Sequence, residues 1–429
     1  MGVMELGWID FSEDARKKTL TVLASLQEPG AIDELGIGIV RDGFAERLFP
    51  GTSTLHTRAK YFFLVPYALK DMERSDNTKK TPRALSREYD KTEESIAKRL
   101  IVNTNEPIGK GIIGARSLHT DLSGNWVKRG PAVMYWNALS TLGFLRNERM
   151  SMGGYFAAIA GTSPLKQTEV SPDDEANGWN DDQTARQTLW HVPTGDYARW
   201  SVGEAEDSIK LTEGEARFFA TQVRMKCAGS LYQAVVDDAD LCDALLGLTG
   251  QASKEDGGAA RFERSRMPFQ DLFRVARDRI SPDLALLCRH AATFSDFVYL
   301  CRIRYNAQLP ALEEVANDAW EDAESYMHEW ASALDVGWIY EHLDLFGRGG
   351  AYPLRAFLSE AKADMLAGDV ASLDECIRRR EREIKRERAK IGREGGSIET
   401  WRGGTWLTYR SEVAARMLAD VREAGGLDA

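Results

Sequence analysis

Residues 33–66, DELGIGIVRDGFAERLFPGTSTLHTRAKYFFLVP, bring glycines, hydroxyls, cations and aromatic residues together in one stretch. Within it, the PG pair at 50–51 predicts a turn, and the TST run at 52–54 offers N-cap hydroxyls to a following helix. Arg58 and Lys60 would then lie in the first two turns of that helix. Because a helix start has free N–H groups, this pattern predicts an anion-binding site. The alternative is an ordinary N-cap before a buried aromatic helix.

A second group of candidate residues surrounds residues 131–145, PAVMYWNALSTLGFL. Pro131 suits the first position of a helix, and Gly143 suits its C-terminal cap. A helix that ends in L-G-F-L is typical of the last helix of a winged helix-turn-helix, just before the wing. The cations that flank it would contact DNA phosphates, and they are Lys128, Arg129, Arg146 and Arg149. The alternative is a packed amphipathic helix with a glycine cap.

The C-terminal part of the chain combines a basic run with aromatic residues. Residues 378–393 hold nine Lys or Arg against three Glu, and isoleucine recurs every seven residues at Ile377, Ile384 and Ile391. This spacing predicts a helix with a narrow apolar seam and a charged remaining surface. We expect this module to neutralise phosphates and stack on bases through Arg379, Arg382, Arg386, Trp401, Arg402, Trp406, Tyr409 and Arg410. The alternative is a solvated helix followed by a tryptophan-anchored turn.

Other patterns in the chain lead to no reaction. Residues 109–114, GKGIIG, match G-x-G-x-x-G, but no clear strand precedes them, so a flexible loop is preferred to a dinucleotide site. Glu321, Glu324 and His328 share one face of an expected helix, but their bulky apolar neighbours favour an ordinary acidic surface over a metal site. We therefore predict no catalytic residue, no metal and no cofactor.

The opening LGWIDFSEDARKKTL and the later DELGIGIVRDGFAERLFPGTSTLHTRAKYFF resemble an uncharacterised family of bacterial proteins, catalogued as a domain of unknown function. Members of that family often lie in antiphage defence islands. Further motifs follow in the expected order, namely Gly111 to Gly114 with PAVMYWNALSTLGFL, then HAATFS and YN, then W-x-G and YR. The resemblance implies a biological context, phage defence, and transfers no catalytic residue.

Length and composition limit the class of protein. The 429 residues are 43% hydrophobic and 28% charged, which indicates an ordinary globular protein of two or three domains. The opening residues carry acids without an apolar core of secretory length, and no apolar run approaches ~18 residues, so we expect a cytoplasmic protein without membrane contact. Five scattered cysteines lack C-x-x-C spacing and support neither a disulfide framework nor a zinc ribbon.

Helical signals dominate the chain, for example at residues 12–26, 92–100, 212–228 and 283–309, and few stretches alternate as strands do. We therefore expect a mainly α, multi-helical fold with a winged-helix-like element in the N-terminal half. Proline, glycine and acidic residues gather at 161–195 and mark the main boundary. The predicted parts are a basic helical domain at 1–160, a linker or long loop at 161–195, a helical domain with an acidic face at 196–370, and a basic helical module at 371–429.

Charge is distributed unevenly between these parts. Residues 41–149 hold nineteen cations against twelve anions, whereas residues 305–347 hold ten acids and no Lys or Arg. With the basic C-terminal run, this polarity predicts a non-enzymatic protein that binds nucleic acid or a protein partner. The resemblance implies that this protein partner is a helicase or nuclease of a defence system. Two alternatives stay open: a metal-dependent nuclease whose site converges from distant segments, and a scaffold that recognises only protein through its acidic face.

Overall fold

The computed structural model describes residues 35–165, 187–204, 208–252, 268–345, 350–392, 401 and 406–427. These residues form a mainly helical, multi-helical protein, which confirms the expected fold class. They contain no β-strand, and one antiparallel bridge joins Leu145 to Trp190. The helix expected at 12–26 and most of the linker expected at 161–195 lie outside the described residues.

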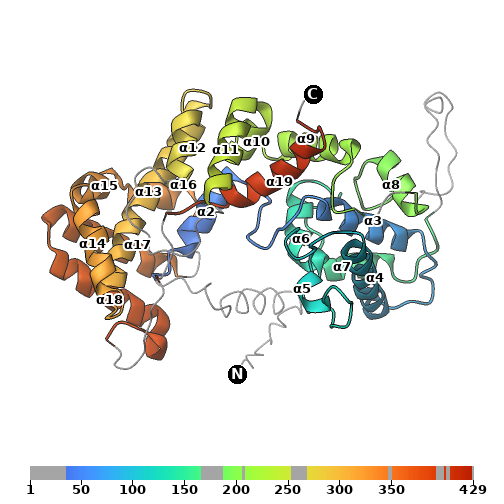
Figure 1. Cartoon of the computed structure of the whole chain (residues 1–429), viewed down its shortest axis with the longest axis horizontal. Coiled ribbons are helices and arrows are strands. Elements are labelled where there is room, and N and C mark those ends of the chain that lie inside the picture. The colour runs from blue at the N-terminus through green and yellow to red at the C-terminus, as the bar shows by residue number, and fades with distance from the viewer. Residues whose placement is uncertain are drawn as a thin grey trace, which may run out of the picture.

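The N-terminal helices gather on one side of the molecule (Figure 1). They are α3 (Tyr61–Glu73), α4 (Pro82–Val102), α5 (Ala115–Leu118), α6 (Pro131–Thr141), α7 (Met152–Ile159) and α8 (Thr194–Ser201). Helix α3 is buried along almost its whole length and packs against α4, α6 and α8. It is therefore the central helix of this half.

The middle of the molecule is built from segments that are distant in sequence (Figure 1). It comprises α2 (Gly38–Leu48), α9 (Glu213–Lys226), α10 (Leu231–Asp237), α11 (Ala239–Ala252), α12 (Pro268–Ala276) and the C-terminal α19 (Ser411–Glu423). Helix α19 packs against α9 and α11, and α2 packs against α10 and α13 (Pro282–Ala307). The C-terminal helix thus returns to the centre of the fold.

The remaining helices form the other side of the molecule (Figure 1). They are α13 (Pro282–Ala307), α14 (Glu313–Glu324), α15 (Met327–Ala333), α16 (Val336–His342), α17 (Ala351–Ala367) and α18 (Val370–Lys385), followed by a 3-10 turn at Arg386–Arg388. Helix α13 packs against α14, α15 and α18, so its long apolar surface organises this half.

Local capping signals place several of these helices where the sequence predicts them. Thr212 and Glu215 form a complete capping box at the start of α9. Ser281 caps α13, and Pro282 takes its first position, where a missing N–H costs nothing. At the end of α6, Gly143 adopts φ 72°, and the Phe144 N–H donates to the Leu139 carbonyl at 2.9 Å. This is a glycine-terminated helix end, as expected from L-G-F-L.

The winged-helix-like element and the domain boundaries stay predictions. After α6, the chain makes backbone bonds from Arg146 N to Leu189 O and from His191 N to Phe144 O, but the described residues form no wing strand. Apolar contacts also cross the expected boundary, since Phe219 of α9 lies 5.0 Å, ring to ring, from Phe62 of α3. The buried residues form a single contiguous cluster through both halves of the described structure.

Candidate nucleic-acid interface

The loop before α3 contains the residues that the sequence singles out for anion binding, but the helix begins later than expected. The Thr52 hydroxyl is buried and donates to the Phe49 carbonyl at 2.6 Å, so it caps no helix. Helix α3 starts at Tyr61 after Lys60, which provides no side-chain cap. The prediction of an N-cap within 52–54 is therefore wrong, and Arg58 and Lys60 precede the helix instead of lying in its first turns.

An anion does lie at this helix start, and it belongs to the protein itself. The Asp420 carboxylate of α19 accepts from the Ala59 N–H at 2.8 Å and from Arg58 Nε at 3.0 Å. Arg58 also donates to the Lys110 carbonyl at 3.1 Å. Burial raises the pKa of Asp420, and the Arg58 guanidinium opposes that shift. The expected geometry of cation and free N–H groups is present, but an internal carboxylate satisfies it.

Lys60 is neutralised in the same way. Its Nζ lies 2.8 and 2.6 Å from the two carboxylate oxygens of Glu215, and both side chains are buried. Glu215 also accepts from the Thr212 N–H at 2.9 Å as part of the α9 capping box. The pair therefore ties the start of α3 to the start of α9, and Lys60 is not accessible to a phosphate.

Helix α6 holds this loop from its other side. His56 stacks on Tyr135 with ring centroids 4.2 Å apart, and its two ring nitrogens lie near Ser53 N and Met134 O, each at 3.2 Å. Burial lowers the pKa of His56 to about 4, so the ring is neutral at pH 7. The Tyr135 hydroxyl accepts from the Thr57 N–H at 2.8 Å. Sequence reasoning missed both rings because a lone His and a helix Tyr carry no motif.

The aromatic residues of the C-terminal module lie in the core. Tyr409 is 1% exposed, and its hydroxyl donates to the Ala291 carbonyl at 2.6 Å. Trp406 is buried and stacks on Tyr299 with centroids 4.0 Å apart. In this fold neither ring is accessible for a base to stack on. Trp401 is half-buried, and Arg402 lies outside the described residues.

Arg410 joins the C-terminal segment to the N-terminal loop. It donates to the Thr52 carbonyl at 2.8 Å and lies 3.4 Å from the Asp42 carboxylate. Arg58, Lys60 and Arg410 therefore come together around one loop, but each has an internal partner. We infer that this group of cations is structural.

The basic run does not form one continuous helix. Helix α18 ends at Lys385, and the 3-10 turn follows, so the seven-residue seam through Ile391 is interrupted. Glu381 is fully buried and accepts from the Tyr305 hydroxyl at 2.7 Å and from the Ile391 N–H at 3.0 Å. Arg380 is also buried and donates to the Leu35 carbonyl at 3.0 Å. One face of this run is therefore internal.

The other face of the run is exposed. Arg379 pairs with Glu360 of α17. Arg382 and Arg386 are exposed and make no ion pair with any described residue, and the same is true of Arg388. Of the predicted C-terminal site, Arg382 and Arg386 are therefore exposed and without an ion pair among the described residues.

Accessible cations also occur in the N-terminal half. Lys128 and Arg146 are exposed, and Arg129 is half-buried. Sequence reasoning missed a further set on α4, where Arg83, Arg87 and Lys91 recur every four residues. All three are exposed and without an ion pair in the described structure. Residues four apart share one helix face, so this set forms a basic stripe, and the i, i+4 spacing was the signal that could have found it.

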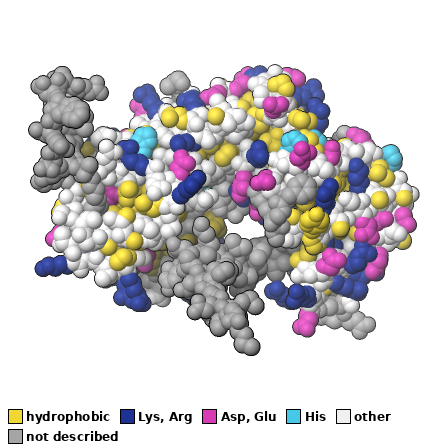
Figure 2. Space-filling model, turned by 180° about the vertical axis from the view of Figure 1, so that it is seen from behind, with side chains coloured by type: hydrophobic (Ala, Val, Ile, Leu, Met, Phe, Trp, Pro, Cys, Tyr) yellow, Lys and Arg dark blue, Asp and Glu magenta, His cyan; other side chains and the backbone are white. Residues whose placement is uncertain are grey.

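Acidic side chains also lie close to this stripe, for example Glu88 and Asp90. Figure 2 shows Lys and Arg side chains scattered among Asp and Glu over the face that it presents. Near the stripe, Glu88 pairs with Lys80 and Glu94 pairs with Lys98. No continuous basic groove is visible among the described residues on that face.

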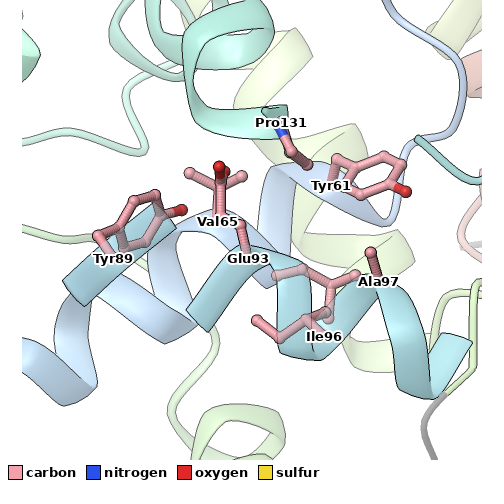
Figure 3. A pocket seen from close by; sticks show the side chains of 8 residues that line it. Tyr61, Val65, Tyr89, Glu93, Ile96, Ala97 and Pro131 are labelled. Carbon is pink, nitrogen blue, oxygen red and sulfur yellow. The ribbon is translucent and has the colours of Figure 1, made fainter. Parts of the chain in front are cut away.

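One buried carboxyl lies beside a small apolar hollow between α3, α4 and the start of α6 (Figure 3). Glu93 of α4 is 5% exposed and accepts from the Ala132 N–H of α6 at 2.7 Å. Burial raises its pKa to about 7, while the Ala132 N–H and Tyr89 oppose the shift. The other lining residues are mostly apolar, including Val65 and Ile96. Glu93 thus caps α6, and the other lining residues that carry a polar group are Tyr61 and Tyr89.

The residues considered as metal ligands lie on two helices. Glu321 and Glu324 are in the last turn of α14, which ends at Glu324, whereas His328 is in α15. The expectation that they share one helix face is therefore wrong, because the chain turns between them. All three side chains are exposed, and His328 Nδ1 lies 3.5 Å from the Ser332 hydroxyl.

Comparison with known proteins finds a family match for part of the chain. Residues 3–168 match a family of unknown function (DUF6361). This segment includes α2 to α7 and so contains the loop before α3, the stripe on α4 and the hollow at Glu93. No curated protein and no solved structure matches the chain. None of the described helices combines the length and apolar character that a membrane span requires.

Proposed function

We propose that this protein is a non-enzymatic, cytoplasmic subunit of a bacterial antiphage defence system that binds nucleic acid and works with a helicase or nuclease partner. The defence context is supported by the resemblance of its sequence motifs. The binding role is supported by one observation above the others, the exposed cations without ion-pair partners on α4 and at the end of α18. Lys128 and Arg146 add to the N-terminal set.

The arrangement favours weak, charge-driven binding. Each set can neutralise about three phosphates, and each neutralised phosphate releases about one counterion, so affinity would fall steeply with salt. Of the aromatic residues predicted to stack on bases, Trp406 and Tyr409 are buried and Trp401 is half-buried. Sequence preference is therefore expected to be low. The two sets lie in opposite halves of the molecule (Figure 1) and are testable separately.

We predict that replacing Arg83, Arg87 and Lys91 together with Glu weakens binding to duplex or single-stranded nucleic acid. The same is expected for Arg382, Arg386 and Arg388. Each triple variant should reduce the slope of log affinity against log salt by about one unit for every phosphate that the variant no longer neutralises. Mobility-shift or fluorescence-anisotropy titrations at several salt concentrations measure this slope.

A matched control comes from α9, where Arg217, Arg224 and Lys226 already pair with acids. Their triple replacement with Glu changes net charge equally and should leave the salt slope near that of the wild type. If all three triple variants behave alike, the binding reflects overall charge and the proposed surfaces are wrong. If the wild type does not bind at low salt, nucleic-acid binding is excluded.

That last outcome would favour the scaffold alternative. Helix α14 carries exposed acids, among them Glu313, Glu314 and Glu321, which would suit a basic protein partner. The nuclease alternative has less support. The group of three metal-ligand residues found among the described residues contains a cysteine, whereas the Mg²⁺ sites of nucleases use oxygen ligands.

A further inference from the structure

Helices α17 and α18 bring two carboxylates and a thiol to one point. Glu360 and Asp364 lie one turn apart on α17, and Cys376 faces them from α18. The two helices are joined through Gly368, which adopts φ 70°. One ligand atom from each residue lies within 4.8 Å of the other two. We propose that Glu360, Asp364 and Cys376 form a zinc-binding site, a role that goes beyond the proposed nucleic-acid function and does not depend on it.

Two side chains in this cluster have atoms without a hydrogen-bond partner among the described residues. Cys376 is 1% exposed and forms no disulfide, and no hydrogen bond to its sulfur is found in the described structure. The Asp364 Oδ2 atom is buried and has no hydrogen-bond partner in the described structure. Buried polar atoms are normally satisfied, so an unpaired carboxylate oxygen beside an unpaired thiol indicates a missing partner. A cation between them would satisfy both.

The ligand set selects the metal. A thiolate favours Zn²⁺ over Mg²⁺ or Ca²⁺, which prefer oxygen ligands. Three protein ligands leave the fourth position of a tetrahedral zinc open to water. Tetrahedral coordination would bring the ligand atoms to roughly 3.5 Å from one another. Because Glu360 is exposed and its side chain is long, it is the ligand that can move to close the site.

The thiolate, not the thiol, is the form of cysteine that binds a metal. Zinc binding would form the Zn–S bond and release the thiol proton to solvent, so affinity should increase with pH.

Arg379 competes with the metal. Its guanidinium pairs with Glu360, and the two side chains are 49% and 46% exposed. An exposed ion pair contributes little free energy, so a divalent ion can displace it. Removing Arg379 should therefore strengthen zinc binding, whereas removing a ligand should weaken it. These opposite directions distinguish this site from adventitious binding elsewhere.

The test uses the full chain, titrated with Zn²⁺ against a chromophoric chelator and with Co²⁺ as a spectroscopic substitute. The wild type should bind one Zn²⁺ and, with Co²⁺, show a thiolate-to-metal charge-transfer band. Cys376→Ser should abolish the band, and both Cys376→Ser and Asp364→Asn should lower zinc affinity at least tenfold. Arg379→Gln should raise it several-fold.

Two controls accompany these variants. Cys288→Ser changes another buried thiol outside the cluster, and His328→Ala removes the histidine considered as a ligand from the sequence, so both should bind zinc like the wild type. Circular dichroism checks that each variant is folded. If Cys376→Ser does not fold, the zinc affinity of Asp364→Asn tests the ligand set instead. The proposal is overturned if the wild type shows no charge-transfer band, if the band survives in Cys376→Ser, or if Arg379→Gln and Asp364→Asn leave the affinity unchanged.

Discussion

Replacing Lys60 with Met is expected to lower the free energy of unfolding by about 3–5 kcal/mol, the cost of leaving a buried charge uncompensated. Lys60 Nζ contacts both carboxylate oxygens of Glu215, whose side chain is 1% exposed. Without the ammonium, the Glu215 carboxylate stays buried beside an apolar side chain. Urea unfolding followed by circular dichroism at pH 7 measures the loss.

Two further variants serve as controls for the Lys60→Met measurement. Arg217→Met breaks an exposed ion pair on the same helix, α9, and should cost at most about 1 kcal/mol. The double variant Lys60→Met with Glu215→Gln should recover part of the loss, because the amide oxygen of Gln can still accept from the Thr212 N–H without carrying charge. A Lys60→Met variant as stable as Arg217→Met would show that water relieves the buried charge.

The same pair shows what sequence could and could not predict. Local signals were sufficient for the fold class and for several helix ends, since Thr212 with Glu215 and Gly143 act within a few residues of themselves. The partner of Lys60 is 155 residues away, and no local rule identifies it. The charge of Lys60 therefore suggested an exposed, anion-binding side chain, whereas in the fold Lys60 forms a buried ion pair with Glu215.

The anion site illustrates the limit more sharply. The sequence suggested that a helix start with Arg58 and Lys60 in its first turns offers cation and N–H groups to an anion, whereas both residues precede α3. The anion, Asp420, lies 361 residues from Ala59 and is supplied by the last helix. The Asp420 carboxylate occupies the site because α19 packs against the central helices α9 and α11, and the local sequence does not predict this packing.

Aromatic and basic residues in the C-terminal module were ambiguous for a related reason. A segment rich in Arg and aromatic residues can form either a nucleic-acid-binding surface or part of the core. The two cases differ only in which of its side chains other parts of the protein bury. Tyr409 is covered by Phe44 and Phe269, which come from α2 and α12. The basic stripe on α4 is exposed, unlike the aromatic residues of the C-terminal module. Its i, i+4 spacing is visible in the sequence, but only the structure shows that its side chains are exposed.

Replacing Glu93 with Gln is expected to stabilise the protein at high pH and to leave it nearly unchanged in acid. Burial raises the pKa of Glu93 from 4.5 to about 7 in the folded state. The protonated form therefore stabilises the fold below pH ~4, and this contribution is lost as pH rises through about 7. A shift of this size corresponds to about 3 kcal/mol. Gln never ionises and keeps an oxygen that can accept from the Ala132 N–H.

The measurement is the free energy of urea unfolding from pH 4.5 to pH 8.5 for the wild type, Glu93→Gln and Glu94→Gln. Glu94 neighbours Glu93 but pairs with Lys98 at 2.7 Å at the surface, so its variant should follow the wild-type pH profile. Glu93→Gln should diverge from the wild type between pH 5 and pH 7 and reach a constant difference above pH 8. Parallel curves for all three proteins would show that Glu93 keeps an ordinary pKa. A divergence of the opposite sign, with Glu93→Gln less stable than the wild type above pH 5, would show instead that the carboxylate acts as a charged cap of α6 with a lowered pKa.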